Sequence, residues 1–140
     1  MAGMIARAGF LLILAACAAS RPQEHHADED ALGPYSGSVR AGGLVFCSGK
    51  IGTRGRSFEL EFETALDAVE AELQKSGLDL GDVLNVTVYL TDMERFGELN
   101  RIYARRFPEP FPARTTVAVA SLPGGARVEI HAIAATSGAP

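Results

Sequence analysis

The sequence predicts a small α+β domain with the element order β-β-α-β-α-β-β and both helices packed on one face of a single sheet. Three observations support this: a glycine hairpin signal, two helical segments that are apolar on one side only, and strict alternation in the last strands. The 140 residues, 47% of them hydrophobic and 21% charged, suit one ordinary globular domain with short additions.

The first two strands are predicted over residues 38–41 and 44–48, joined by Gly42 and Gly43. Further glycines follow, but no lysine with serine or threonine stands where a phosphate-binding loop needs them. We therefore interpret residues 50–57 as a plain loop.

Two helices are predicted, over residues 58–76 and from a capping box at residues 91–94 to about Phe107. Ser57 suits the N-cap of the first helix, and Gly77 ends it. The apolar residues of each helix recur at helical spacing and are expected to be buried. They are Phe62, Ala65, Leu66, Val69 and Leu73 in the first helix, and Phe96, Leu99, Ile102, Tyr103 and Phe107 in the second.

Three more strands are predicted over residues 84–90, 114–120 and 127–135. Alternation is expected to bury one face under the helices, through Leu84, Val86, Val88 and Leu90 in the first of these strands and Val128, Ile130, Ala132 and Ala134 in the last. The other face is expected to carry Arg127, Glu129, His131 and Ile133, with Arg114 and Thr116 opposite Val117 and Val119. Such a face is either solvated or packed against another subunit around a polar pocket.

Residues 1–16 are interpreted as a signal peptide, because Arg7 precedes an apolar run too short to span a bilayer. Residues 14–17, Leu-Ala-Ala-Cys, resemble a bacterial lipobox, so Cys17 is the expected lipidation site and membrane anchor. Ala18 after the cysteine, by resemblance to Gram-negative lipoproteins, favours the periplasmic face of the outer membrane.

Residues 17–30 are polar and lack apolar periodicity, which predicts a flexible tether before a domain at residues 31–136 and a tail at 137–140. His25 and His26 have no further ligand at metal-binding spacing, so no metal site is predicted. The net charge of −4 and the lack of a basic cluster argue against a nucleic-acid partner. Cys47 is interpreted as a small buried hydrophobe in a strand.

Several short motifs between residues 31 and 135 resemble, in the same order, those of the RidA (YjgF/YER057c/UK114) family. They lie at residues 33–36, 44–49, 83–93, 112–117 and 122–130. The resemblance implies a chorismate-mutase-like fold and a barrel-like homotrimer with pockets between neighbouring subunits. It also implies hydrolysis of reactive enamine or imine acids to 2-keto acids and ammonia, without cofactor or metal.

The resemblance assigns roles to six residues. Arg114 matches the arginine that binds the substrate carboxylate, for which a planar guanidinium is suited. Glu129 matches the acidic residue that positions water and moves protons. The remaining matches line the pocket and bind substrate: Tyr35, Ser48, Gly49 and Thr116.

The chain also departs from the family pattern. Lys50 stands where glutamine is usual, Gly52 where proline is usual, and His131 where a second glutamate is common. The loop at residues 52–57 is shorter than in the archetype. The charges at Lys50 and His131 are expected to alter the pocket and its choice of substrate.

The expected function is deamination of small 2-imino acids at a pocket between subunits. The alternative is a protective lipoprotein that binds small carboxylates or acts as a holdase without catalysis. RNA cleavage, suggested by some relatives, fits poorly with an export signal and a negative net charge.

Overall fold

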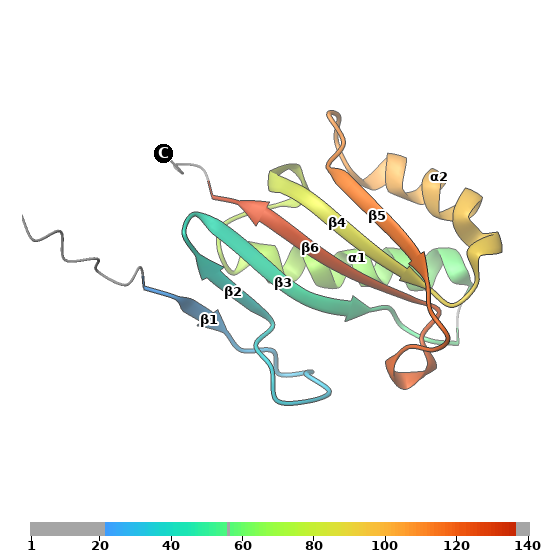
Figure 1. The fold of residues 1–140 in the computed structure, drawn as a ribbon, viewed down its shortest axis with the longest axis horizontal. Coiled ribbons are helices and arrows are strands. Elements are labelled where there is room, and N and C mark those ends of the chain that lie inside the picture. The colour runs from blue at the N-terminus through green and yellow to red at the C-terminus, as the bar shows by residue number, and fades with distance from the viewer. Residues whose placement is uncertain (1–21, 56, 137–140) are drawn as a thin grey trace, which may run out of the picture.

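The computed structural model describes residues 22–55 and 57–136. One sheet carries two helices, both on the same face, which confirms the predicted α+β class (Figure 1). The strands lie in the order β1-β2-β3-β6-β4-β5, and only β4 and β5 run parallel. The elements are β1 (Glu24–His26), β2 (Ser38–Ala41), β3 (Leu44–Ile51), α1 (Phe58–Gln74), β4 (Val83–Leu90), α2 (Phe96–Arg106), β5 (Ala113–Ala118) and β6 (Val128–Ala135).

Strand β1 corrects the predicted tether. Glu24, His25 and His26 pair antiparallel with Arg40, Val39 and Ser38 of β2, so part of residues 17–30 belongs to the fold. Sequence periodicity misses such a strand because its pairing uses backbone groups at a sheet edge and needs no apolar face.

The predicted signal peptide at residues 1–16, the lipidation site Cys17 and the tail at 137–140 lie outside the described residues. Within the described part of the chain, neither helix is both long and apolar enough to cross a membrane.

The predicted hairpin turn and the predicted N-cap of the first helix are confirmed. Gly42 and Gly43 both have positive φ, at 58° and 83°, as a tight hairpin between β2 and β3 requires. The Ser57 side chain accepts a hydrogen bond from the backbone N–H of Leu60 and caps α1. The predicted loop starts too early, however, because β3 continues through Lys50 and Ile51 after a bulge between Cys47 and Lys50.

Two predicted core residues are exposed. The pairing of β4 with β6 shifts register between Val83 and Asn85, so Val83 enters the core and Leu84 is 52% exposed. A bulge of this kind inserts one residue and breaks the alternation locally. Phe96 is 40% exposed because a short 3₁₀ turn, Met93–Arg95, capped by Asp92, precedes α2 and replaces the predicted capping box.

The core lies between the sheet and the two helices. The predicted inward face of β6, formed by Val128, Ile130, Ala132 and Ala134, is fully buried. Cys47 is also buried in this core, and its burial raises the pKa of the thiol to about 12, as expected for a structural cysteine.

Arg127 does not face away from the helices as predicted. Its Nε lies 2.7 Å from Oε2 of Glu61, and its backbone N–H donates to Oε1 of the same carboxylate at 2.7 Å. Glu61 is 1% exposed, so this carboxylate needs a charged partner. Because Arg127 precedes β6, the alternation of that strand does not fix its direction.

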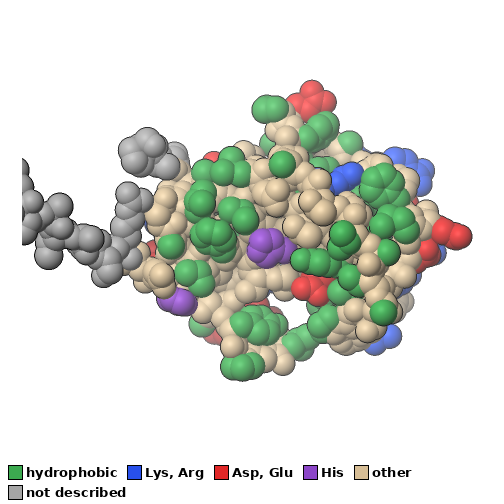
Figure 2. Space-filling model, in the orientation of Figure 1, with side chains coloured by type: hydrophobic (Ala, Val, Ile, Leu, Met, Phe, Trp, Pro, Cys, Tyr) green, Lys and Arg blue, Asp and Glu red, His purple; other side chains and the backbone are tan. Residues whose placement is uncertain are grey.

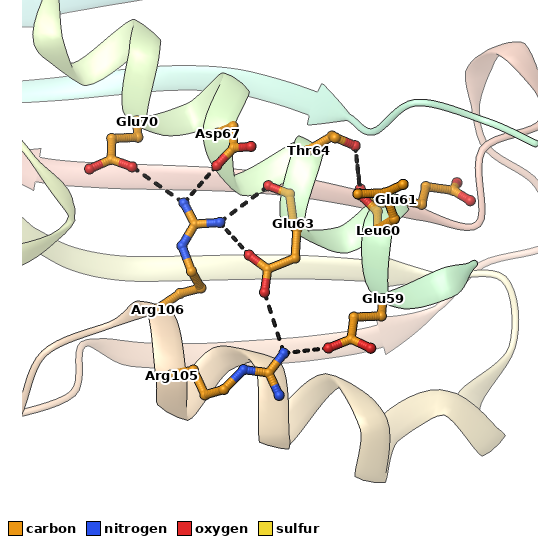
Figure 3. A network of polar contacts seen from close by, with 9 residues as sticks. All are labelled: Glu59, Leu60, Glu61, Glu63, Thr64, Asp67, Glu70, Arg105 and Arg106. Atoms are coloured by element: carbon orange, nitrogen blue, oxygen red, sulfur yellow. Dashed lines mark hydrogen bonds and ion pairs between the residues drawn. The ribbon is translucent and has the colours of Figure 1, made fainter. Parts of the chain in front are cut away.

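A network of ion pairs joins α1 to α2 (Figure 3). Arg106 bonds Glu63, Asp67 at 2.8 Å and Glu70 at 3.3 Å. Arg105 bonds Glu59 at 2.6 Å, but its side chain is 54% exposed, against 20% for Arg106. Partial burial limits screening by solvent, so Arg106 is expected to contribute more to helix packing.

Replacing Arg106 by glutamine is expected to lower the free energy of unfolding by about 1–2 kcal/mol, between the values for exposed and buried pairs. Arg105→Gln, the matched control, is expected to have a smaller effect. Urea unfolding of both variants measures the difference. Equal losses in the two variants would show that burial of Arg106 does not matter.

Candidate functional site

A cavity of about 870 Å³ lies where the loop between β1 and β2 passes the end of β3. It brings together four of the predicted site residues: Tyr35, Ser48, Gly49 and Glu129. The back of the cavity is formed by the C-terminal half of α1, through Ala68, Ala71, Glu72 and Lys75. Figure 2, which views the sheet face not covered by helices, shows an opening between this loop and the body of the domain.

The carboxylate of Glu129 lies directly over the backbone of Gly49. A Cβ atom at Gly49 would come within 1.9 Å of Oε1 of Glu129, so only glycine allows this approach. Val128 and Ile130 point under the helices, so Glu129 between them points to the open face. Among the described residues, the Glu129 side chain forms no hydrogen bond or ion pair, although its backbone pairs with β3 and β4. Its carboxylate is therefore free to accept protons from a water or a ligand.

Tyr35 and Ser48 form the wall beside Glu129. The Tyr35 hydroxyl accepts a hydrogen bond from the backbone N–H of Leu32 at 3.0 Å, and its side chain is about half exposed. The Ser48 hydroxyl donates to the carbonyl of Ser36 at 2.7 Å. Both residues therefore hold the loop in place as well as line the cavity.

Arg114 lies elsewhere, on the helix side of the sheet. Its guanidinium stands 4.5 Å from the ring centroid of Tyr103 and 5.6 Å from that of Phe96, both on α2. One Nη2–H donates to Oδ1 of Asn100 at 2.6 Å. Among the described residues no carboxylate pairs with Arg114. The guanidinium is thus held in place and still available to an anion.

The expectation that Arg114 and Thr116 share the open face with Glu129 is wrong within one chain. In the parallel pairing of β5 with β4, Arg114 stands beside Val86 and Thr116 beside Val88, and both valines are fully buried on the helix side. Strand β4 also separates β5 from β6. One chain therefore keeps Arg114 and Glu129 on opposite faces.

Two hydroxyl groups near Arg114 are buried without a partner among the described residues, those of Tyr103 and Thr116. Burial raises the pKa of Tyr103 to about 12, so its hydroxyl remains a proton donor. Sequence reasoning assigned Tyr103 to the core and missed Asn100. The signal for both was their helical spacing from Phe96, which places the three residues on one face of α2.

A largely buried charge cluster also lines the cavity. Lys50 donates to Oδ2 of Asp28 at 2.5 Å and to Oε2 of Glu72 at 3.3 Å. Glu72, which is 3% exposed, also accepts from Lys75 at 2.9 Å and from Ser38 at 2.9 Å. The motif resemblance implies a glutamine at the position of Lys50. The positive charge of this lysine is compensated by neighbouring carboxylates.

The pKa directions agree with this pairing. The hydrogen bond from Lys50 lowers the pKa of Asp28. Burial alone would raise the pKa of Glu72, but the hydrogen bonds from Lys75 and Ser38 and the charge of Lys50 outweigh it, and the net shift is downward. Burial likewise opposes the charge on Lys50, yet Asp28 and Glu72 raise its pKa overall. All three groups therefore stay charged at neutral pH.

The rest of the open face carries exposed hydrophobic side chains among polar ones (Figure 2). Phe46 and Val117 are 40% and 37% exposed on it. His131 lies in the middle of β6 beside Thr87 of β4, pointing away from the buried residues on either side of it. In the part of the chain that the structure describes, no three histidine, cysteine or acidic side chains gather as a metal-binding group.

Comparison with known proteins agrees with this fold. The family model described as endoribonuclease L-PSP matches residues 26–136, so the domain begins before the predicted residue 31. The chain is 40% identical over 111 residues to the chloroplastic Reactive Intermediate Deaminase A of Arabidopsis thaliana, covering 74% of the chain but 59% of that relative. It is equally identical over 111 residues to the mouse 2-iminobutanoate/2-iminopropanoate deaminase, covering 74% of the chain and 82% of that protein.

A solved structure supports the same assignment. Escherichia coli TdcF with bound serine superposes with a TM-score of 0.72 at 35% identity, covering 76% of the chain and 91% of TdcF. The sheet order, the motif residues around Glu129 and Arg114, and these matches lead to one conclusion: the chain belongs to the RidA (YjgF/YER057c/UK114) family.

Proposed function

We propose that the protein hydrolyses small 2-imino or enamine acids to 2-keto acids and ammonia, without a cofactor. The observation that carries this proposal is the unpaired carboxylate of Glu129, held over Gly49 in a cavity that Tyr35 also lines. Two relatives named as deaminases of such intermediates support the reaction class. Serine bound to TdcF supports a ligand of amino-acid size that bears a carboxylate.

The chemistry follows from what the imine needs. A water molecule must attack the carbon of the C=N bond while the nitrogen gains protons. Glu129 accepts the proton of the attacking water and then delivers it to the nitrogen of the tetrahedral adduct. Glu129 next takes the carbinol O–H proton and passes it to the same nitrogen. The C–N bond breaks, ammonia leaves with the bonding pair, and the carbinol oxygen becomes the carbonyl of the keto acid. Glu129 ends in its starting state.

The substrate carboxylate is assigned to Arg114 of a neighbouring copy. Arg114 cannot serve the cavity of its own chain, because it lies on the opposite face of the sheet. Asn100 and Tyr103 fix the guanidinium of Arg114, and no carboxylate pairs with it among the described residues. Its planar N–H groups are therefore available to a substrate carboxylate. The exposed hydrophobic side chains of the open face, such as Phe46 and Val117, support assembly as a homotrimer with its sheets turned inward.

The protein is also proposed to be anchored to the cell envelope by lipid at Cys17, on the periplasmic side of the outer membrane. The lipobox-like residues 14–17 support this proposal. Because β1 starts at Glu24, the domain would sit close to the bilayer. Labelling with a radioactive fatty acid is expected to mark the full chain and not Cys17→Ser. Equal labelling of both would contradict the anchor.

Glu129→Gln is expected to lower kcat/KM for imino-acid hydrolysis by about 100-fold or more, because an amide cannot accept the water proton. The assay measures ammonia and keto acid released from imines generated by an amino-acid oxidase. Glu59→Gln, outside the cavity, is the matched control. Activity of Glu129→Gln equal to that of wild type would contradict the role of Glu129. A wild-type protein that releases no ammonia would leave the alternative, a non-catalytic carboxylate-binding or holdase-type protein, which the exposed hydrophobic side chains favour.

Arg114→Ala and Glu129→Gln are each expected to be inactive alone but to complement when unfolded and refolded together. If each site takes Arg114 from one copy and Glu129 from the next copy around the trimer, random mixing would leave about one quarter of the sites intact. The activity of the mixture, compared with each variant refolded alone, measures this. No recovery in a mixture shown to contain both chains would contradict a shared site, and wild-type activity no higher than that of Arg114→Ala would remove the enzyme proposal.

A further inference from the structure

We propose that Lys50 acts as a positioning residue: its ion pair with Asp28 holds the loop of residues 28–35 against the domain as the outer wall of the cavity. The pair thereby sets the affinity for substrate. This inference rests on the function proposed above and assigns a role to a residue in which the chain departs from its family.

The loop is organised internally around Asp28 and Tyr35. The Asp28 side chain accepts a hydrogen bond from the backbone N–H of Asp30 at 3.1 Å, and its carbonyl accepts one from Ala31 at 3.2 Å. The Tyr35 hydroxyl accepts from Leu32 at 3.0 Å. At the base, the N–H of Gly37 donates to the carbonyl of His26 at 2.8 Å and closes the loop. The loop can therefore move as one unit about its base.

One polar contact fastens this unit to the domain. In the described part of the chain, the bond from Lys50 to Asp28 is the only hydrogen bond or ion pair between residues 28–35 and the sheet or helices. The neighbouring bonds, from Lys75 to the carbonyl of Ala27 and from Ser48 to that of Ser36, lie at the two ends of the loop. Asp28 follows Ala27 directly, so Lys50 adds a side-chain contact at the first end of the loop, where Lys75 holds the backbone.

Lys50 is itself held rigidly. Its side chain is 10% exposed and also bonds Glu72, which Lys75 and Ser38 hold from the other side. A buried pair of this kind is little affected by salt. Removing the lysine would leave the Asp28 carboxylate, 18% exposed, without its counter-charge, and hydration would then favour movement of Asp28 out into water.

Movement of the loop would take Leu32 and Tyr35 away from Ser48, Gly49 and Glu129, which also line the cavity. The wall contacts substrate in the ground state and in the transition state alike. Loss of such uniform binding raises KM and leaves kcat unchanged. The pair therefore acts on affinity, whereas Glu129 acts on the chemical step.

The test compares Asp28→Asn and Lys50→Met with wild type. Asparagine at position 28 keeps the oxygen that accepts from Asp30 and loses only the charge that pairs with Lys50. It also leaves Lys50 bonded to Glu72. Asp28→Asn therefore tests the proposal even if Lys50→Met does not fold. Arg105→Gln, which removes an exposed ion pair between the helices, is the matched control. Lys50→Arg keeps the charge and is expected to rescue the wild-type behaviour.

For both test variants we expect KM for the imino acid to rise about tenfold, as the loss of one charge-assisted hydrogen bond allows, with kcat changed by less than about twofold. Hydrogen–deuterium exchange is expected to speed up in residues 28–35 and to stay unchanged in β6. A fall in kcat at constant KM, or exchange and KM equal to wild type, would overturn the proposal.

The exchange measurement needs no activity. If wild-type protein releases no ammonia from any imino acid, the deaminase proposal fails, while faster exchange in Asp28→Asn would still show that the pair holds the loop.

Discussion

The packing of α1 and α2 on one face of the sheet fixes the direction of every side chain that the site uses. Each residue that turns toward the helices is lost to the open face, and each residue that turns away is available to solvent or to another chain. Glu129 falls on the open side, between Val128 and Ile130 in the core. Arg114 falls on the helix side, where α2 holds it. A site that uses both groups is therefore incomplete in one copy.

Local patterns in the sequence were sufficient for most of the fold. The glycine hairpin, the Ser57 cap and the inward residues of β6 follow from rules that act over a few neighbouring residues. The exceptions depend on pairing between distant segments. The bulge that exposes Leu84 and the parallel register that turns Arg114 inward are set by which strands meet, and alternation along one strand carries no such information.

Only part of the site could be predicted from the sequence. Tyr35, Ser48, Gly49 and Glu129 line one cavity, whereas Arg114 and Thr116 lie on the other face of the sheet. The partners of Lys50 could not be read from the sequence, because Asp28 lay in a segment without periodicity and Glu72 on a helix whose contacts were unknown. That ion pair shows that the charge of a largely buried lysine is compensated by carboxylates distant in the chain.

Cys47 has a consequence for the conditions under which the domain can work. Oxidants and disulfides react with the thiolate, and this thiol, 1% exposed with its pKa raised to about 12, is both protonated and shielded at neutral pH. It is the one cysteine among the described residues. The described part of the domain therefore presents no reactive thiol, and its cysteine chemistry suits an oxidising compartment as well as a reducing one.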